Sequence, residues 1–410
     1  TEREIRQSNP ILPQEVTTLP PGLPLKIPIY YQPFWSNPAL ILHDSLFVNG
    51  PAQKGFNAVA FVQSKPGWFK DYEFFTGERT HKGGELINLI ALDYSLSPRL
   101  LLALVEFQTG ALSQSTRPDD LEQTYPLGYK NANNRGLYRQ LIWAANLLNH
   151  AFYSWRSGRL SQWDLLDGRL ERPDPWQNAA SIALQYYFSR IFQPATYLGA
   201  INSGGFSKTY RDLFGDPLTA EAHIPGSLTQ PALRLPFKPG APWAYTGGPH
   251  TAYGDGEPFG AIDFAPPAVA GGCQSTNEWA TALADGVIAR TSLAIALLDL
   301  DGDGDERTGW VVFYLHLASE GMVQSGQRLK AGDPLGHPSC EGGRATGTHV
   351  HIARKYNGEW IPADGPLAFN LEGWIAQRGS QPYEGYLVRA GKTIRACTCS
   401  DQNSHIQSGQ

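Results

Sequence analysis

Two histidines separated by one residue, His349 and His351, stand in the run Thr-Gly-Thr-His-Val-His of this 410-residue sequence. On a β-strand, alternate side chains point to the same face, so the two imidazoles are expected on one face, about 6 to 7 Å apart along the backbone. Such a pair suits one metal ligand with an acid or base beside it.

Three residues upstream complete the side-chain types of a catalytic zinc site. They are His250 in Gly-Gly-Pro-His, Asp263 in Gly-Ala-Ile-Asp-Phe and His316 in Tyr-Leu-His-Leu. A catalytic zinc ion takes three histidine or carboxylate ligands and keeps a fourth position open for water. A His, Asp, His set from these residues would supply the ligands, which leaves the remaining histidines as candidate acids or bases.

The order and local settings of these residues resemble the lysostaphin-like zinc endopeptidases, and among them the secreted β-lytic and staphylolysin-type enzymes. In that family a His and a well-separated Asp precede a lone His in a Tyr-x-His-Leu context and a final Gly-x-His-x-His. All four pieces stand in this order, within residues 235–374. The resemblance implies that His250, Asp263 and His351 bind zinc, and that His316 and His349 are the catalytic histidines.

The implied chemistry is hydrolysis by an activated water. Zinc lowers the pKa of its bound water to about 7 and polarises the scissile carbonyl. We expect His349 to act as general base and acid, a role that contributes roughly 10² to 10⁴ in rate. We expect His316 to stabilise the oxyanion with a hydrogen bond. Either histidine could serve as the base, because both would lie beside the metal ligands.

The four cysteines bear on the cellular compartment. Secreted relatives commonly carry a disulfide in this domain, so the resemblance favours a bond between Cys273 and Cys340. Cys397 and Cys399 could pair with each other or with other cysteines, because sequence alone does not fix the connectivity of four cysteines. The alternative is a set of reduced buried thiols, which would fit a cytosolic enzyme.

The elements that must position the site are short strands in the second half. Residues 286–290 and 308–316 are rich in β-branched and aromatic side chains, and residues 326–336 contain glycine turns. This pattern predicts a mainly antiparallel β-domain with a cleft, over residues 235–378. Residues 379–410, which contain the last two cysteines, are expected to form a C-terminal tail.

The first half is expected to be mainly helical, which makes the predicted fold class α+β with several domains. Residues 1–50 are rich in proline and are expected to form an extended arm. Helical signals dominate residues 51–234, where Ser97 and Pro98 begin a helix that Gly110 ends. Further helices are predicted over residues 137–153 and 179–188.

Residues 94–110 resemble the helix that carries the acid in lysozyme-like enzymes. Those helices end in Glu-Ser-Gly or Glu-Thr-Gly, whereas this one ends in Gln108, Thr109 and Gly110. An amide cannot protonate a glycosidic oxygen, and Glu106 lies about 200° around the helix from Gln108. We therefore expect this half to hold glycan strands without cutting them. The alternative is an unrelated helical bundle.

Four carboxylates, those of Asp299, Asp301, Asp303 and Asp305, occupy alternate positions in the second half. Bound Ca²⁺ would relieve their repulsion, and the spacing with glycines between them resembles the start of an EF-hand loop. The bidentate Glu of such loops is absent, because Trp310 stands at the twelfth position. The alternative to a calcium site is a solvated acidic turn.

Composition limits the classes of partner. The chain is 41% hydrophobic and 17% charged, which is typical of a globular protein with more than one domain. A net charge of -5 argues against a nucleic-acid partner. No apolar stretch reaches the length of a transmembrane segment.

The expected function is that of a secreted or cell-surface zinc endopeptidase that cuts peptide cross-bridges of bacterial peptidoglycan. The substrate class comes from the family resemblance, since spacing alone indicates only a hydrolytic zinc site. Two alternatives belong to other classes. One is a non-catalytic cell-wall-binding or regulatory protein that keeps the fold, and the other is a glycan hydrolase acting through the helical half.

Overall fold

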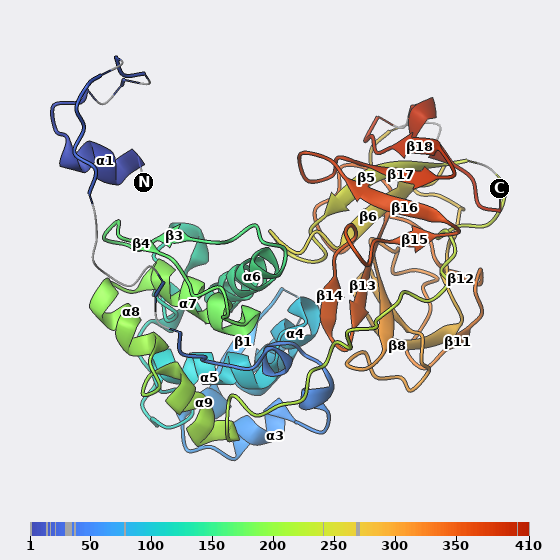
Figure 1. Cartoon of the computed structure of the whole chain (residues 1–410). Coiled ribbons are helices and arrows are strands. Elements are labelled where there is room, and N and C mark those ends of the chain that lie inside the picture. Colours follow the sequence, from blue (N-terminus) through green and yellow to red (C-terminus); the bar gives the residue numbers. More distant parts are fainter. Residues whose placement is uncertain are drawn as a thin grey trace.

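The chain forms a helical half followed by a half made of antiparallel strands, which confirms the α+β prediction (Figure 1). A computed structural model describes residues 2–13, 15–16, 18–20, 22–28, 35–36, 38–77, 79–240, 242–267, 271–399 and 401–409. Within these residues, no helix combines the length and apolarity needed to cross a lipid bilayer.

The first half contains most of the helices, and their caps follow the sequence signals. For the predicted helix over residues 98–109, the Ser97 side chain accepts a hydrogen bond from the Leu100 amide, and Gly110 ends the helix with a φ of 64°. The α-helices are α1 (Glu2–Ser8), α2 (Asp44–Phe47), α3 (Ala58–Gln63), α4 (Gly83–Tyr94), α5 (Pro98–Thr109), α6 (Leu137–Arg156), α7 (Ala179–Ile191), α8 (Pro194–Ile201) and α9 (Phe206–Phe214). Short 3-10 helices span Pro51–Gln53, Trp68–Asp71, Leu121–Gln123, Ala132–Asn134 and Gln402–Ser404.

The strands of the first half form two small hairpins. They are β1 (Glu73–Phe75) with β2 (Thr80–Lys82) and β3 (Trp163–Asp164) with β4 (Leu170–Glu171). The strands of the second half are β5 (Trp243–His250), β6 (Ala261–Ala265), β7 (Ala280–Thr281), β8 (Gly286–Ser292), β9 (Ile295–Asp299), β10 (Trp310–Leu315), β11 (Arg328–Leu329), β12 (Pro334–Gly336), β13 (Val350–Tyr356), β14 (Glu359–Ile361), β15 (Asn370–Leu371), β16 (Trp374–Arg378), β17 (Gly385–Arg389), β18 (Lys392–Arg395) and β19 (His405–Ile406).

The largest sheet of the described residues has nine strands. Eight of them follow the order β11-β8-β9-β10-β13-β6-β5-β19, and β14 pairs with β13. In its centre His351 lies opposite Asp263 on one side and opposite Leu315 on the other. The sheet register therefore brings two of the expected metal ligands side by side, next to the end of the strand that leads to His316.

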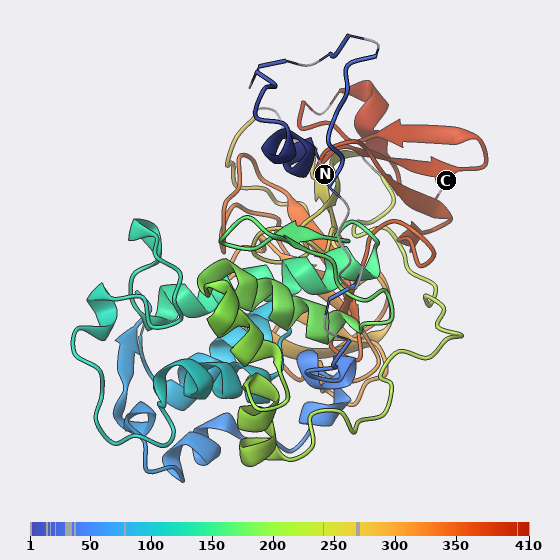
Figure 2. The ribbon, with the colours of Figure 1, turned by 60° about the vertical axis from the view of Figure 1, so that its left-hand side comes forward.

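The two faces of this sheet belong to two hydrophobic cores. The face that bears Asp263 and His351 continues with Ala261, Phe313 and Ala353, and these three residues share a core with the helical half. Side chains on the opposite face form a second core within the β half. Figure 2 shows the helical half in front of the sheet. The helices thus cover part of the face on which the expected ligands lie.

Polar contacts join the two halves at the edge of this shared core. The Tyr153 hydroxyl accepts a hydrogen bond from the Trp360 amide at 2.9 Å, and the Trp360 indole donates to the Tyr94 carbonyl at 3.3 Å. Asp93 at the end of α4 lies 3.5 Å from the Arg290 guanidinium of β8. The halves are therefore packed as one folded unit.

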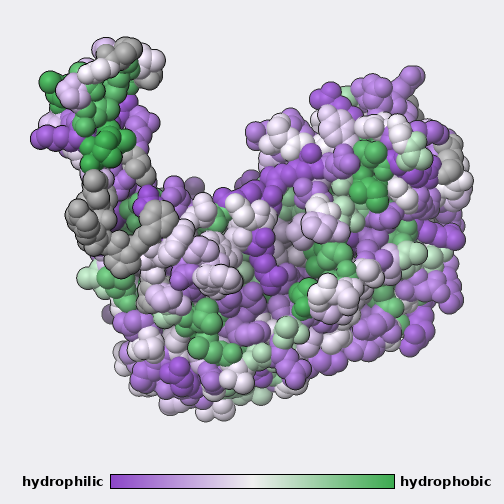
Figure 3. Space-filling model, viewed as in Figure 1, coloured by the Kyte–Doolittle hydropathy of each residue, from purple (hydrophilic) through white to green (hydrophobic). Residues whose placement is uncertain are grey.

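The prediction of an extended arm over residues 1–50 is wrong at both ends of this segment. Helix α1 forms where an i,i+4 pair joins Glu2 and Arg6. Ile41, Leu42 and Phe47 are fully buried in the helical core, because their apolar side chains fill it. Residues 29–34 lie outside the described part of the chain. Figure 3 shows hydrophobic side chains gathered on the part of the arm that follows α1, where Ile11, Leu19, Leu23 and Ile27 are exposed.

The expected C-terminal tail over residues 379–410 is also wrong. Strands β17 and β18 extend the small sheet that begins with β15 and β16, and β19 pairs with β5 at the edge of the large sheet. Leu387, Ile394 and Ile406 anchor these strands in the core of the β half. The end of the described chain therefore belongs to the β half.

Candidate metal centre

Three side chains converge where β5, β6 and β13 meet. The Nε2 atom of His250 lies 3.1 Å from Nδ1 of His351. Each of these nitrogens lies 3.3 Å from the Asp263 Oδ1 atom. The structure therefore brings together the His, Asp and His that the sequence predicts as ligands, although 101 positions separate the two histidines.

This triangle of atoms has the dimensions of one face of a zinc tetrahedron. Bonds of about 2.0 to 2.1 Å at tetrahedral angles place ligand atoms about 3.3 to 3.4 Å apart. Asp263 Oδ1 is buried and has no hydrogen-bond partner in the protein. A buried carboxylate oxygen without a donor is unfavourable, and a cation would satisfy it. The donor set and its spacing thus fit zinc.

The outward nitrogens of His250 and His351, the two predicted ligand histidines, are held by backbone carbonyls. His250 Nδ1 donates to the Gly248 carbonyl at 2.8 Å, and His351 Nε2 donates to the Ala252 carbonyl at 3.0 Å. A carbonyl oxygen can only accept, so these contacts fix the proton on the outward nitrogen. The lone pair of each inward nitrogen is then free for a metal.

The two residues at Gly247 and Gly248, just before Pro249 and His250, have no space for a side chain. A Cβ at Gly247 would lie 2.4 Å from the Asp263 Oδ2 atom, and one at Gly248 would lie 2.5 Å from the backbone of Glu384. A side chain at Gly247 would push the carboxylate out of place. The Gly-Gly-Pro-His sequence therefore makes room for the carboxylate and for the chain that crosses above it.

Burial and neighbouring charges set the ionisation of this cluster. Burial alone would raise the pKa of Asp263, but His250 and His349 outweigh it and hold the pKa well below its ordinary value. Burial lowers the pKa of His351 despite the adjacent carboxylate. Burial and the nearby His349 lower the pKa of His316 to about 4. The carboxylate is therefore ionised, and His316 and His351 are neutral near pH 7.

The two remaining histidines, His316 and His349, lie next to each other beside the predicted ligands. The rings of His316 and His349 are 4.5 Å apart, and His349 Nε2 lies 3.9 Å from Asp263 Oδ2. His316 Nδ1 donates to the Glu341 carbonyl and His349 Nδ1 to the Gly347 carbonyl, both at 2.7 Å. With Nδ1 donating, each neutral ring keeps a lone pair on Nε2 for proton transfer.

Tyr383 is a part of the site that no local motif indicates. Its ring stacks on the His250 imidazole with ring centres 4.1 Å apart. Its carbonyl accepts a hydrogen bond from the Gly248 amide at 2.8 Å. The side chain is half-exposed, so it forms a wall of the site on the solvent side. Tyr383 belongs to the segment predicted as a tail, and only the pairing of the last strands brings it back over β5.

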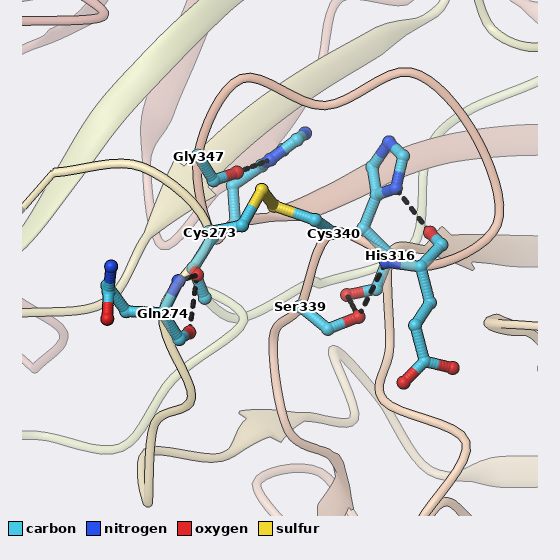
Figure 4. The surroundings of a disulfide bond; sticks show 9 residues. Cys273, Gln274, His316, Ser339, Cys340 and Gly347 are labelled. Carbon is cyan, nitrogen blue, oxygen red and sulfur yellow. Dashed lines mark hydrogen bonds between the residues drawn. A yellow bond between two sulfur atoms is a disulfide. The ribbon is translucent and has the colours of Figure 1, made fainter.

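The predicted Cys273–Cys340 disulfide is confirmed, and Cys397 pairs with Cys399. The first bond lies near one of the two predicted catalytic histidines, with His316 close to one of its cysteines (Figure 4). The second closes a short turn near the end of the chain. None of the four cysteines is free, which excludes the alternative of reduced thiols.

The acidic loop after β9 brings three of its four carboxylates together. Asp299, Asp301 and Asp303 each place one oxygen within 4.8 Å of the others. Asp305 instead binds Arg307 at 2.7 Å. Asp299 is fully buried, and burial raises its pKa to about 6.

Lys54 of the helical half also reaches this loop. Its ammonium lies 3.2 Å from Asp303 and 3.6 Å from Asp305. Cations from the chain itself therefore neutralise part of the loop.

Glu106 and Gln108 lie at one cavity of about 530 Å³ near the end of α5. Gln108 donates to the Leu127 carbonyl at 2.9 Å and accepts from the Tyr187 hydroxyl at 2.7 Å. Glu106 accepts from the Leu112 amide at 2.6 Å. Both side chains thus make contacts that stabilise the end of the helix.

Comparisons with known proteins match both halves of the chain. A family model described as LasA, N-terminal domain, matches residues 40–227. Protease LasA of Pseudomonas aeruginosa is 25% identical over 378 residues, which cover 87% of this chain and 84% of the relative. The beta-lytic metalloendopeptidase of Achromobacter lyticus is 30% identical over 141 residues, or 32% of this chain and 35% of the relative. A solved structure titled A Novel M23 Metalloprotease Pseudoalterin from Deep-sea is 26% identical and covers 40% of this chain and 95% of its own, with a TM-score of 0.34.

Proposed function

We propose that this chain, a homologue of Protease LasA and of the beta-lytic metalloendopeptidases, is a zinc metalloendopeptidase that hydrolyses peptide cross-bridges of bacterial peptidoglycan. The observation that carries the proposal is the triangle of ligand atoms from His250, Asp263 and His351, whose edges of 3.1 to 3.3 Å match a zinc tetrahedron. Two further histidines beside this triangle supply the groups for proton transfer.

His250, Asp263 and His351 would hold the zinc ion, which would supply a Lewis acid and make water more acidic at this position. His349 takes the proton of the attacking water and passes it to the leaving amine, because its Nε2 lone pair lies beside the ligand triangle. His316, with its ring 6.2 Å from that of His351, would stabilise the oxyanion of the tetrahedral intermediate only after it gains a proton on Nε2, because its Nδ1 already donates to the Glu341 carbonyl.

The substrate reaches the site from the side of His349 and Tyr383. His250, Asp263 and His351 are almost fully buried, whereas the side chain of His349 is 15% exposed and Tyr383 is half-exposed. Peptides with small side chains would reach these buried groups most readily. Peptidoglycan lies outside the bacterial membrane, and the disulfides suit an oxidising compartment. We therefore place the protein in the secreted or cell-surface class.

Muropeptide analysis after digestion tests the proposal. We expect new amino termini and no new reducing ends, activity that is lost with EDTA and restored by zinc, and about one zinc per chain. His349→Ala should reduce turnover by roughly 10² to 10⁴ while zinc stays bound. His405→Ala, which replaces an exposed histidine of β19, is the matched control and should keep wild-type turnover. Full activity of His349→Ala, or cleavage that yields reducing ends, would contradict the assignment.

Binding of glycan strands by the helical half stays a prediction. The cavity at the end of α5 offers Glu106, Gln108 and Thr109, but Gln108 is already bonded to the Tyr187 hydroxyl. The amide of Gln108 disfavours the alternative of a glycan hydrolase, because an amide at this position cannot act as an acid. Binding of peptide-free glycan chains to the zinc-loaded His349→Ala protein, measured by calorimetry, checks the prediction. No heat of binding would rule it out.

Calcium at Asp299, Asp301 and Asp303 also stays a prediction. Their spacing suits oxygen ligation, and a cation would favour the ionised form of the buried Asp299. The ion pairs of Asp303 with Lys54 and of Asp305 with Arg307 support the alternative of a turn neutralised by the chain itself.

A further inference from the structure

The Cys273–Cys340 disulfide joins two irregular segments near the two proposed catalytic histidines, and Figure 4 shows it close to His316. Its cysteines are 67 positions apart, and neither lies in one of the strands that bear the metal ligands. One segment, residues 337–343, contacts His316. The other, residues 271–279, contacts the residue before His349.

The segment around Cys340 fixes both the backbone and the ring of His316. The Ser339 amide and hydroxyl donate to the His316 carbonyl at 2.7 and 3.1 Å. The Glu341 carbonyl accepts from His316 Nδ1 at 2.7 Å. His316 has a φ of 65°, a left-handed conformation that is unfavourable for a residue other than glycine and persists only where the surroundings enforce it. The residues on either side of Cys340 provide that enforcement.

The segment around Cys273 holds the approach to His349. The Gly272 carbonyl accepts from the Thr348 amide at 3.1 Å, and the Gln274 amide donates to the Thr348 hydroxyl at 2.8 Å. The His349 amide in turn donates to the Ser339 carbonyl at 3.3 Å. Thr348 and His349 therefore lie between the two segments that the disulfide connects.

Without the disulfide, the Cys273 segment would depend on these few hydrogen bonds. Residues 271–275 are exposed, and hydrogen bonds of exposed loops open readily because water competes for them. The metal ligands would not share this freedom, since Asp263 and His351 lie in the buried centre of the large sheet. Loss of the bond would thus loosen the catalytic histidines and leave the metal triangle in place.

We propose that the Cys273–Cys340 disulfide is a positioning element of the hydrolytic site, which holds His316 and His349 in a fixed arrangement relative to each other and to the metal ligands. The proposal deepens the peptidase function and rests on it. A bond that only stabilised the fold would leave the turnover of the folded enzyme unchanged. A positioning element acts on kcat, because a shift of about 1 Å in a catalytic group can reduce the rate about 100-fold.

The test compares two double variants that each remove one disulfide. Cys273→Ser/Cys340→Ser removes the bond at the site, and Cys397→Ser/Cys399→Ser is the matched control. For each protein, kcat and KM on a soluble cross-linked muropeptide are measured below the unfolding temperature, together with zinc content. We expect the first variant to lose about 10- to 100-fold in kcat with one zinc per chain and KM nearly unchanged. The control should keep the wild-type kcat.

Two further measurements keep the test decisive. Thr348→Val serves as the second variant in case the double variant does not fold. It retains the disulfide but loses the hydroxyl contacts with Gln274, and it should reproduce part of the loss in kcat. Nuclear magnetic resonance of the imidazole protons provides a readout independent of turnover. The slowly exchanging Nδ1 proton of His316 should be seen in the wild type and lost in the Cys273→Ser/Cys340→Ser variant.

An unchanged kcat in the variant without the Cys273–Cys340 bond would overturn the proposal. Equal losses in both double variants, or loss of zinc in parallel with kcat, would also overturn it. A wild-type protein that binds zinc but cleaves no peptide would instead refute the proposed function, while the imidazole measurement would still decide whether the disulfide positions His316.

Discussion

Glu306→Gln should strongly destabilise the protein, because Glu306 neutralises two buried cations where the halves meet. Its carboxylate lies 2.7 Å from the Lys355 ammonium and 2.5 Å from the Arg290 guanidinium. The Lys355 and Glu306 side chains are only 2% and 7% exposed, so water cannot replace the lost charge. Removal of one partner from a buried ion pair destabilises by about 3 to 5 kcal/mol.

The pKa of Glu306 gives a second route to the same magnitude. Burial opposes ionisation, but Lys355 and Arg290 outweigh it and lower the pKa from 4.5 to about 2. A carboxyl whose pKa is lower in the folded state contributes stability above its unfolded pKa and loses it as the pH falls toward the folded pKa. The shift in the pKa of Glu306 corresponds to roughly 3 kcal/mol at pH 7 and to roughly 2 kcal/mol at pH 3.5.

Urea denaturation of the wild type and Glu306→Gln at pH 7 and pH 3.5 measures this contribution. We expect one cooperative transition, because the helical half and one face of the sheet share a core. Glu320→Gln, at an exposed position, is the control and should change the free energy of unfolding by less than about 0.5 kcal/mol. A loss below about 1 kcal/mol at pH 7, or a difference that does not narrow at pH 3.5, would refute the reasoning.

Three other outcomes are expected from the site and its surroundings. His351→Ala should reduce the zinc content of the purified protein well below one per chain, whereas His349→Ala retains it, as measured by metal analysis; equal contents would argue against the ligand assignment. Burial raises the pKa of Asp93 to about 6, so the folded state holds this proton more tightly, and stability should rise by about 2 kcal/mol as the pH falls from 6 to 4. Asp93→Asn should lack that rise in unfolding experiments across this range. Added Ca²⁺ should raise the melting temperature of the wild type but not of Asp299→Asn, and no shift in either protein would favour the solvated turn.

Local signals in the sequence were sufficient for single elements in both halves of the chain. In the helical half, the Ser97 and Gly110 caps define helix α5 because they satisfy the backbone groups at its ends, without help from distant residues. The alternation around His351 likewise places the side chain on one face of a strand, and the Gly-Gly-Pro-His sequence reserves the space that the Asp263 carboxylate occupies. A family resemblance then indicated which of these residues belong together.

The chain ends were predicted incorrectly because their structure depends on distant partners. Residues 41–47 follow a proline-rich stretch, yet Ile41 and Phe47 are buried in the helical core. The last strands carry few local signals, and their pairing with β16 and β5 decides that they belong to the β half. Tyr383 was missed for the same reason, since its place over His250 depends on that pairing.

The sequence by itself determined the types of the site residues, their order and the faces of the strands that bear them. Only the tertiary structure decided that Nε2 of His250, Oδ1 of Asp263 and Nδ1 of His351 approach to within 3.3 Å, and that a disulfide connects the segments that hold His316 and His349. The physical reason is that strand character and capping arise from neighbours along the chain. A metal site instead requires side chains from distant strands, and their separation is set by sheet register and core packing.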